Sequence, residues 1–146
     1  MSSHDILLVE DNPDDVELTR LAFTEAGEPH RLHVVSDGAE AVDYLLRRGR
    51  HAARDLADLP ALVLLDLNLP RLDGREVLQA IRADDTTRCL PVVVLTTSAE
   101  PFDVEQAYAL GANSYIQKPV EFDRFVEVVR QVGRDGLAIN LPPGRC

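Results

Sequence analysis

Residues 61–70 read Ala-Leu-Val-Leu-Leu-Asp-Leu-Asn-Leu-Pro, so that five consecutive apolar residues are followed directly by an acidic one, Asp66. An unbroken apolar run of this length is typical of a strand that is covered on both faces, whereas a strand with one face in water would alternate. The stretch therefore predicts a central strand of a parallel sheet, with a carboxylate at its carboxyl end.

Four further short apolar runs lie on either side of this stretch, at residues 6–9, 32–35, 91–95 and 114–116. Segments with apolar residues at helical spacing separate the runs, and several of these segments end near a glycine. This alternation predicts five strand–helix units, (βα)5, and right-handed crossovers then make the sheet parallel. We predict an α/β fold, a doubly wound parallel five-stranded sheet of order 2-1-3-4-5 with helices on both faces.

The length and charge of the chain limit its class. Its 146 residues suit one domain, and its net charge of −10 disfavours contact with nucleic acid or an anionic membrane. The longest apolar run is far shorter than the roughly 20 residues that cross a bilayer, and the N-terminus has no signal-peptide pattern. Cys89 and Cys146 make no disulfide framework, which fits a reducing compartment. We expect a cytoplasmic domain that binds neither nucleic acid nor membrane.

Polar side chains follow four of the predicted strands where the chain leaves the sheet. Glu10 and Asp11 follow the first strand, Asp66 the third, Thr96 the fourth and Lys118 the fifth. In the order 2-1-3-4-5 the first and third strands are neighbours, so the three carboxylates should converge in one crevice. Carboxylates held this close repel one another unless a cation compensates them, and a hard divalent ion such as Mg²⁺ suits oxygen ligands. The sequence therefore predicts a Mg²⁺ site at this edge.

The groups around that site suggest a chemistry. A Mg²⁺ ion, the ammonium of Lys118 and the hydroxyl of Thr96 would together stabilise a phosphoryl group in transfer. A spare carboxylate would be the nucleophile and form an aspartyl-phosphate. Each residue alone also has an ordinary structural explanation, such as an acidic residue at a helix N-terminus or a threonine in a strand. Their joint occurrence at one edge of the sheet favours a functional site.

With these residues the chain resembles the receiver domains of two-component response regulators, over residues 5–133. The motifs that carry the resemblance are Glu10-Asp11-Asn12-Pro13, Asp66 within residues 64–70 followed by Asp73-Gly74, Thr96, Gly111-Ala112, Tyr115 and Lys118-Pro119. The resemblance implies a flavodoxin-like receiver fold in which Asp66 accepts a phosphoryl group from a sensor histidine kinase.

The resemblance also implies a role for each site residue. The implied Mg²⁺ ligands are Glu10, Asp11, Asp66 and the main-chain carbonyl of Asn68. Thr96 and Lys118 would bind the phosphoryl oxygens, and Thr96 and Tyr115 would form the switch. The bond before Pro119 is expected to be cis. The side chains of Asn68 and Ser98 would tune hydrolysis of the acyl phosphate.

Two segments depart from the minimal pattern. Residues 49–60 form a long connection, and residues 134–146 form a C-terminal extension in which Leu137, Ile139 and Leu141 alternate. Both resemble segments of single-domain regulators that are paired with phytochrome-type kinases. We expect a receiver domain over residues 1–133, with the extension serving as a packing or dimerisation arm. Output would then be a protein contact, and we expect a homodimer that uses the extension and the face of the fourth and fifth helices.

Two alternatives remain open. The first is an enzyme, a Mg²⁺-dependent phosphohydrolase that turns over through an aspartyl-phosphate. In the haloacid dehalogenase type the nucleophile lies in an Asp-x-Asp motif after the first strand, whereas here it follows the third strand and Asn68 stands where the second aspartate would be. The second is a degenerate receiver that only binds partners, against which the intact residue set argues. We therefore expect a phosphoacceptor regulator rather than an enzyme.

Overall fold

The computed structural model describes residues 5–27, 30–53, 59–69, 71–97, 100–118 and 121–131. Within them one parallel sheet has the order β2-β1-β3-β4-β5, which confirms the predicted topology. The strands are β1 (Asp5–Val9), β2 (Arg31–Val35), β3 (Leu62–Asp66), β4 (Val92–Thr96) and β5 (Ser114–Gln117). Val9 pairs with Leu65, so β1 and β3 end side by side.

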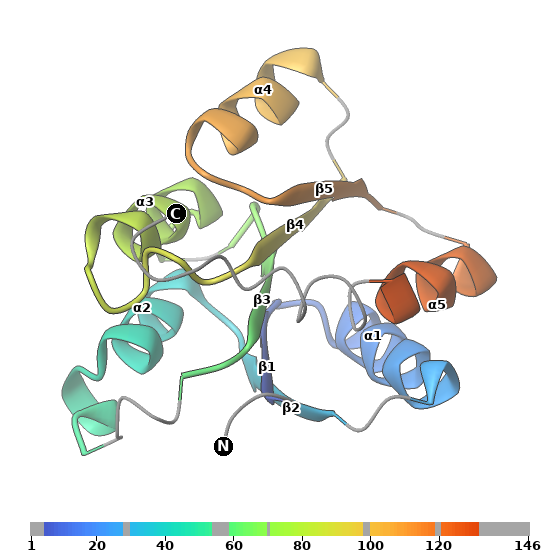
Figure 1. The fold of residues 1–146 in the computed structure, drawn as a ribbon, viewed down its shortest axis with the longest axis horizontal. Coiled ribbons are helices and arrows are strands. Elements are labelled where there is room, and N and C mark those ends of the chain that lie inside the picture. Colours follow the sequence, from blue (N-terminus) through green and yellow to red (C-terminus); the bar gives the residue numbers. More distant parts are fainter. Residues whose placement is uncertain are drawn as a thin grey trace.

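Helices cover both faces of this sheet, as predicted (Figure 1). They are α1 (Pro13–Ala26), α2 (Gly38–Leu46), the 3₁₀ helix η1 (Gly49–His51), α3 (Gly74–Ala83), α4 (Pro101–Ala109) and α5 (Phe122–Gln131). Figure 1 shows α1 and α5 together on one side of the sheet and α2 and α3 on the other, with α4 beyond β5. The strands are therefore enclosed, which explains why their sequences are continuously apolar.

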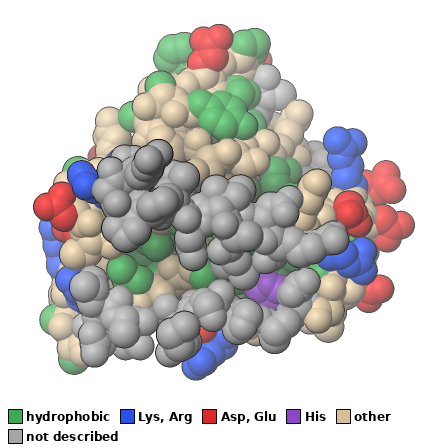
Figure 2. Space-filling view, viewed as in Figure 1, with side chains coloured by type: hydrophobic (Ala, Val, Ile, Leu, Met, Phe, Trp, Pro, Cys, Tyr) green, Lys and Arg blue, Asp and Glu red, His purple; other side chains and the backbone are tan. Residues whose placement is uncertain are grey.

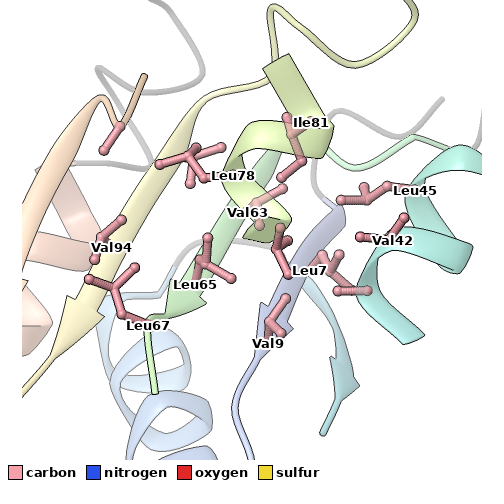
Figure 3. Packing of buried hydrophobic residues seen from close by; sticks show 14 of the residues in the cluster. Leu7, Val9, Val42, Leu45, Val63, Leu65, Leu67, Leu78, Ile81 and Val94 are labelled. Carbon is pink, nitrogen blue, oxygen red and sulfur yellow. The ribbon is translucent and has the colours of Figure 1, made fainter. Parts of the chain in front are cut away.

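Alternate residues of each central strand enter two separate cores. Leu7 and Leu65 belong to the core beneath α2 and α3, which Figure 3 shows from close by. Leu8 and Leu64 belong to the core beneath α1 and α5. Every residue of β3 is buried, whereas the edge strand β2 has a single buried residue. The central strand predicted from the run at residues 61–65 is thus confirmed by burial on both sides, one position later, at Leu62–Asp66.

Local sequence determines where α1 begins and ends. The side chain of Asn12 accepts a hydrogen bond from the backbone N–H of Asp14 at 2.9 Å, and Pro13 occupies the first turn. The helix ends at Gly27, whose φ of 76° is a conformation that glycine adopts without steric cost. This early start places the first turn of α1 directly beside the carboxyl end of β1.

Some expectations fall outside the described residues or are corrected. Cys89 is disulfide-bonded, so the expectation that the cysteines stay reduced is wrong for this residue, and Cys146 lies outside the described residues. The extension at residues 134–146 also lies outside them, as do residues 54–58 of the long connection. Within the part that the structure describes, none of the helices is both long enough and apolar enough to span a bilayer.

Candidate metal and phosphoryl site

Three carboxylates meet where β1 and β3 end. Each of Glu10, Asp11 and Asp66 offers an oxygen, and these oxygens lie within 4.8 Å of one another. Glu10 and Asp66 are buried, with 2% and 7% of their surface exposed, whereas Asp11 is exposed. Adjacent strands thus bring together side chains that are more than 50 positions apart in the sequence.

Backbone N–H groups orient the two buried carboxylates. The N–H of Asn12 donates to Glu10 Oε2 at 3.3 Å, and the N–H of Asn68 donates to Asp66 Oδ1 at 3.0 Å. The N–H of Gly74 donates to the carbonyl of Leu67 at 3.0 Å, which closes the turn between β3 and α3. The chain therefore turns tightly after Asp66 and holds its carboxylate at the edge of the sheet.

Lys118 extends from the end of β5 into this carboxylate group. Its Nζ donates to Glu10 Oε1, to Asp15 Oδ2 at 3.0 Å and to Asp66 Oδ2 at 3.3 Å, and its side chain is only 13% exposed. The backbone N–H of Lys118 donates to the carbonyl of Thr96 at 2.7 Å, which fixes the chain where the side chain departs. One ammonium group thus links α1, β1, β3 and β5 at a single point.

Asp15 is a member of the site that the sequence analysis did not identify. It lies in the first turn of α1, four positions after Asp11 and next to another acidic residue, Asp14. Acidic residues are common in that turn because they favour the positive end of the helix dipole, so the sequence offers no reason to single out this one. No spacing in the sequence indicates it, because Asp15 joins the site only through its contact with the ammonium of Lys118.

Burial and mutual repulsion shift the protonation of the site. Burial raises the pKa of Glu10 from its ordinary 4.5 to about 7, with Asp66 adding to the rise and Lys118 opposing it. For Lys118, burial alone would lower the pKa, but the hydrogen bonds to Glu10 and Asp15 and the charge of Asp66 outweigh it and raise the pKa above 10.5. The lysine is therefore charged at neutral pH. Its single positive charge does not balance the carboxylates around it.

The metal-free protein is expected to lose stability as the pH rises from 4.5 to about 7, because Glu10 binds its proton more tightly in the folded state than in the unfolded chain. That stabilisation is complete below 4.5 and is lost as the pH rises through about 7. Lys118 adds no slope here, since it is charged in both states. We expect the free energy of unfolding to fall by about 1–2 kcal/mol.

Urea unfolding in the presence of a chelator measures this slope. In Glu10→Gln the slope should largely disappear. An unchanged slope in that variant would show that another group is responsible.

The remaining predicted site residues divide into two groups. Thr96, the last residue of β4, is fully buried, and its Oγ1 lies 3.5 Å from Nδ2 of Asn68. Tyr115 in β5 is partly buried and packs against the core beneath α2 and α3. Ser98 and Pro119 lie outside the described residues. The structure thus brings Thr96, Asn68 and Lys118 to the same edge as the carboxylates.

The donor set of this site fits a hard divalent cation. All candidate ligands are oxygens, and two of the three carboxylates are buried, where excess negative charge is costly. One ammonium cannot balance Glu10, Asp11 and Asp66 together, and Asp66 adds to the rise that burial causes in the pKa of Glu10. Cysteine and histidine are not part of the group, which favours an ion such as Mg²⁺ or Mn²⁺ over zinc or copper.

Known proteins share both this sequence and this fold. Residues 6–130 match the family model of the response regulator receiver domain. The probable methanogenesis regulatory protein FilR2 of Methanothrix harundinacea is 42% identical over 139 residues, which are 95% of this chain and 87% of that protein. The response regulator Rcp1 of Synechocystis sp. is 41% identical over 138 residues, 94% of this chain and 92% of that protein.

Solved structures agree with the sequence comparison. The phosphorylated cyanobacterial phytochrome response regulator RcpA superposes with a TM-score of 0.81 at 38% identity, over 97% of this chain and 98% of that one. The Mn²⁺-bound form of Rcp1 also gives a TM-score of 0.81, at 35% identity, over 97% and 99% of the two chains. Relatives of this chain therefore include one that carries a phosphoryl group and one that binds a divalent metal.

This chain belongs to the response regulator receiver domain family. The resemblance found in its sequence is thereby confirmed, and so is its role as a phosphoacceptor module of two-component signal transduction.

Proposed function

We propose that Asp66 is the phosphoacceptor of this receiver domain and that Mg²⁺ is the ion it requires. The proposed ligands are Glu10, Asp11, Asp66 and the main-chain carbonyl of Asn68. The observation that carries the proposal is the convergence of three carboxylates and the Lys118 ammonium at one sheet edge. Asp66 combines burial, membership of that group and a direct contact with the ammonium, which suits a carboxylate that must be held in place for attack.

Transfer to Asp66 can be written with the groups of this chain. A carboxylate oxygen of Asp66 attacks phosphorus, the P–N bond to the phosphohistidine of the kinase breaks, and the electron pair leaves with the imidazole. The Lys118 ammonium, 3.3 Å from the Asp66 carboxylate, neutralises charge on the incoming phosphoryl oxygens. The hydroxyl of Thr96 supplies a further donor. When bound, the divalent ion supplies additional positive charge for those oxygens.

We further propose that the phosphoryl group biases a switch formed by Thr96 and Tyr115. Thr96 ends β4, and Tyr115 lies in the adjacent strand β5, which α4 also contacts. Phe102 and Tyr108 of helix α4 are exposed hydrophobic side chains. Helix α4 lies at the top of Figure 1, and Figure 2 shows hydrophobic atoms at the surface of that region. A shift of Thr96 toward the phosphoryl group would change how Tyr115 packs and so alter this surface.

We also propose a kinase partner, a cellular location and an oligomeric state for this chain. The similarity to RcpA supports a sensor histidine kinase of the phytochrome type as the donor, since RcpA is named as a phytochrome response regulator. We propose a cytoplasmic homodimer, with a receiver domain at residues 1–133 and an arm at residues 134–146. The net charge of −10 supports a protein partner rather than nucleic acid.

Incubation with acetyl phosphate and Mg²⁺, followed by intact-mass spectrometry, tests the function. We expect one lasting phosphate on each chain, and none when a chelator removes the metal, because the carboxylates then repel the incoming anion. Rapid multiple turnover of phosphomonoesters would instead support the phosphohydrolase. Absence of any adduct with Mg²⁺ present would support a degenerate receiver.

A further inference from the structure

Lys118 has one carboxylate partner that does not belong to the candidate metal site. Glu10 and Asp66 contact its Nζ and are also members of the metal-capable group. Asp15 contacts the same Nζ at 3.0 Å, but among the described residues its carboxylate is not a member of that group. The lysine therefore has two partners that a metal would share and one that it would not.

The local structure holds Asp15 toward the lysine. The side chain of Asn12 accepts from the N–H of Asp15 at 3.4 Å, and Thr19 Oγ1 donates to the carbonyl of Asp15 at 2.8 Å. The Asp15 side chain is 34% exposed, whereas its neighbour Asp14 is an exposed residue. The backbone of Asp15 is thus fixed from both sides, and its carboxylate faces the site.

A divalent cation and the present position of Lys118 compete for the same oxygens. A cation bound to Glu10 and Asp66 would repel an ammonium that contacts those two carboxylates. The Lys118 side chain is only 13% exposed, so an ammonium without a carboxylate partner would be poorly hydrated there. Asp15 is the partner that remains available once the other two are taken.

We propose that Asp15 is a positioning residue that keeps the ammonium of Lys118 beside the site when a divalent cation occupies Glu10 and Asp66. The inference rests on the proposed function, because it concerns how the metal and the lysine are accommodated together. By giving the displaced ammonium a partner, Asp15 makes metal binding less costly and leaves the lysine within reach of the phosphoryl group.

Titration of the full chain with Mn²⁺, with free Mn²⁺ measured by electron paramagnetic resonance, tests this role. We expect Asp15→Asn to raise the Mn²⁺ dissociation constant about tenfold. This is the size expected for loss of one partly buried hydrogen bond to a charged group. Asp14→Asn is the matched control, since it removes the same charge from the same helical turn. We expect that control to change the constant by less than about twofold, as an exposed charge does.

The Lys118→Met background separates positioning from a general charge effect. Without the ammonium, Asp15→Asn and Asp14→Asn should change Mn²⁺ affinity equally. The inference would be overturned if Asp15→Asn and Asp14→Asn changed Mn²⁺ affinity equally in the wild-type background. It would also be overturned if Asp15→Asn weakened Mn²⁺ binding as much in Lys118→Met as in the wild type. A wild-type chain that binds Mn²⁺ but takes no phosphate from acetyl phosphate would overturn the proposed function alone, and the affinities would still decide the role of Asp15. A wild-type chain that binds no Mn²⁺ would overturn both.

Discussion

The Asp66→Asn variant is expected to acquire no phosphate from acetyl phosphate and Mg²⁺ under conditions in which the wild-type chain acquires one. An amide oxygen is a poor nucleophile and cannot form the acyl phosphate, and the neighbouring groups that remain only bind and polarise the donor. We expect the rate of adduct formation, followed by intact mass over time, to fall by about 10³-fold or more.

Asp73→Asn provides a matched control for that variant. The same aspartate-to-asparagine change is made seven positions further along the chain. The carboxylate of Asp73 caps α3 by accepting a hydrogen bond from the N–H of Arg75 at 2.8 Å. Asparagine caps a helix about as well as aspartate, so the fold and the adduct should both survive. An adduct that persisted in Asp66→Asn would place the phosphoacceptor elsewhere and would contradict the assignment.

Thermal unfolding tests whether Asp66→Asn loses phosphorylation only because the variant is unfolded. Asp66 raises the pKa of Glu10 by repulsion, so its neutralisation should leave the metal-free protein as stable as the wild type or more stable. A folded but unreactive Asp66→Asn chain is therefore the expected result.

The Gly74→Ala variant is expected to be strongly destabilised. A Cβ at this position would lie 2.4 Å from the carbonyl oxygen of Asp66 and 2.5 Å from Cα of Leu67. Both are backbone atoms and cannot rotate away, so α3 or the turn after β3 must move. We expect a loss of about 3 kcal/mol in the free energy of unfolding, measured with urea. Because the moved backbone carries Asp66, phosphorylation should also slow.

Gly27→Ala is the control for this steric effect. Gly27 has a φ of +76°, but nothing lies within 4 Å of a Cβ built there. That variant should lose only about 1 kcal/mol, from the backbone conformation alone, and keep its phosphorylation rate. Equal stability of the two variants would show that the close approach at Gly74 does not constrain the site.

Much of the fold follows from the sequence, because both faces of the sheet are covered. The run at residues 61–65 is apolar throughout since its alternate side chains enter different cores, so strand and burial could be predicted together. Right-handed crossovers then made the sheet parallel, and we expected its strands in the order 2-1-3-4-5. The convergence of Glu10, Asp11 and Asp66 followed from that order, since each lies at a carboxyl end.

Contacts made by long side chains across the fold could not be predicted in the same way. Arg82 lies near the end of α3, and no motif of the sequence marks it. In the structure it donates to the carbonyl of Leu90 at 2.7 Å and to that of Gly111 at 2.7 Å, which ties α3 to the segments before β4 and β5. Burial accordingly lowers its pKa. The role of Asp15 could not be predicted either, because it depends on where the ammonium of Lys118 lies rather than on any spacing in the sequence.

A crystal structure of the wild-type chain grown with Mg²⁺ tests the central claim most directly, because the claim concerns geometry. We predict one ion held by Glu10, Asp11, Asp66 and the Asn68 carbonyl, at the distance of about 2.1 Å that is usual for a directly bound oxygen, with Lys118 turned from Glu10 toward Asp15. An ion bound elsewhere, or carboxylates of Asp11 and Asp66 that face away from each other, would contradict it.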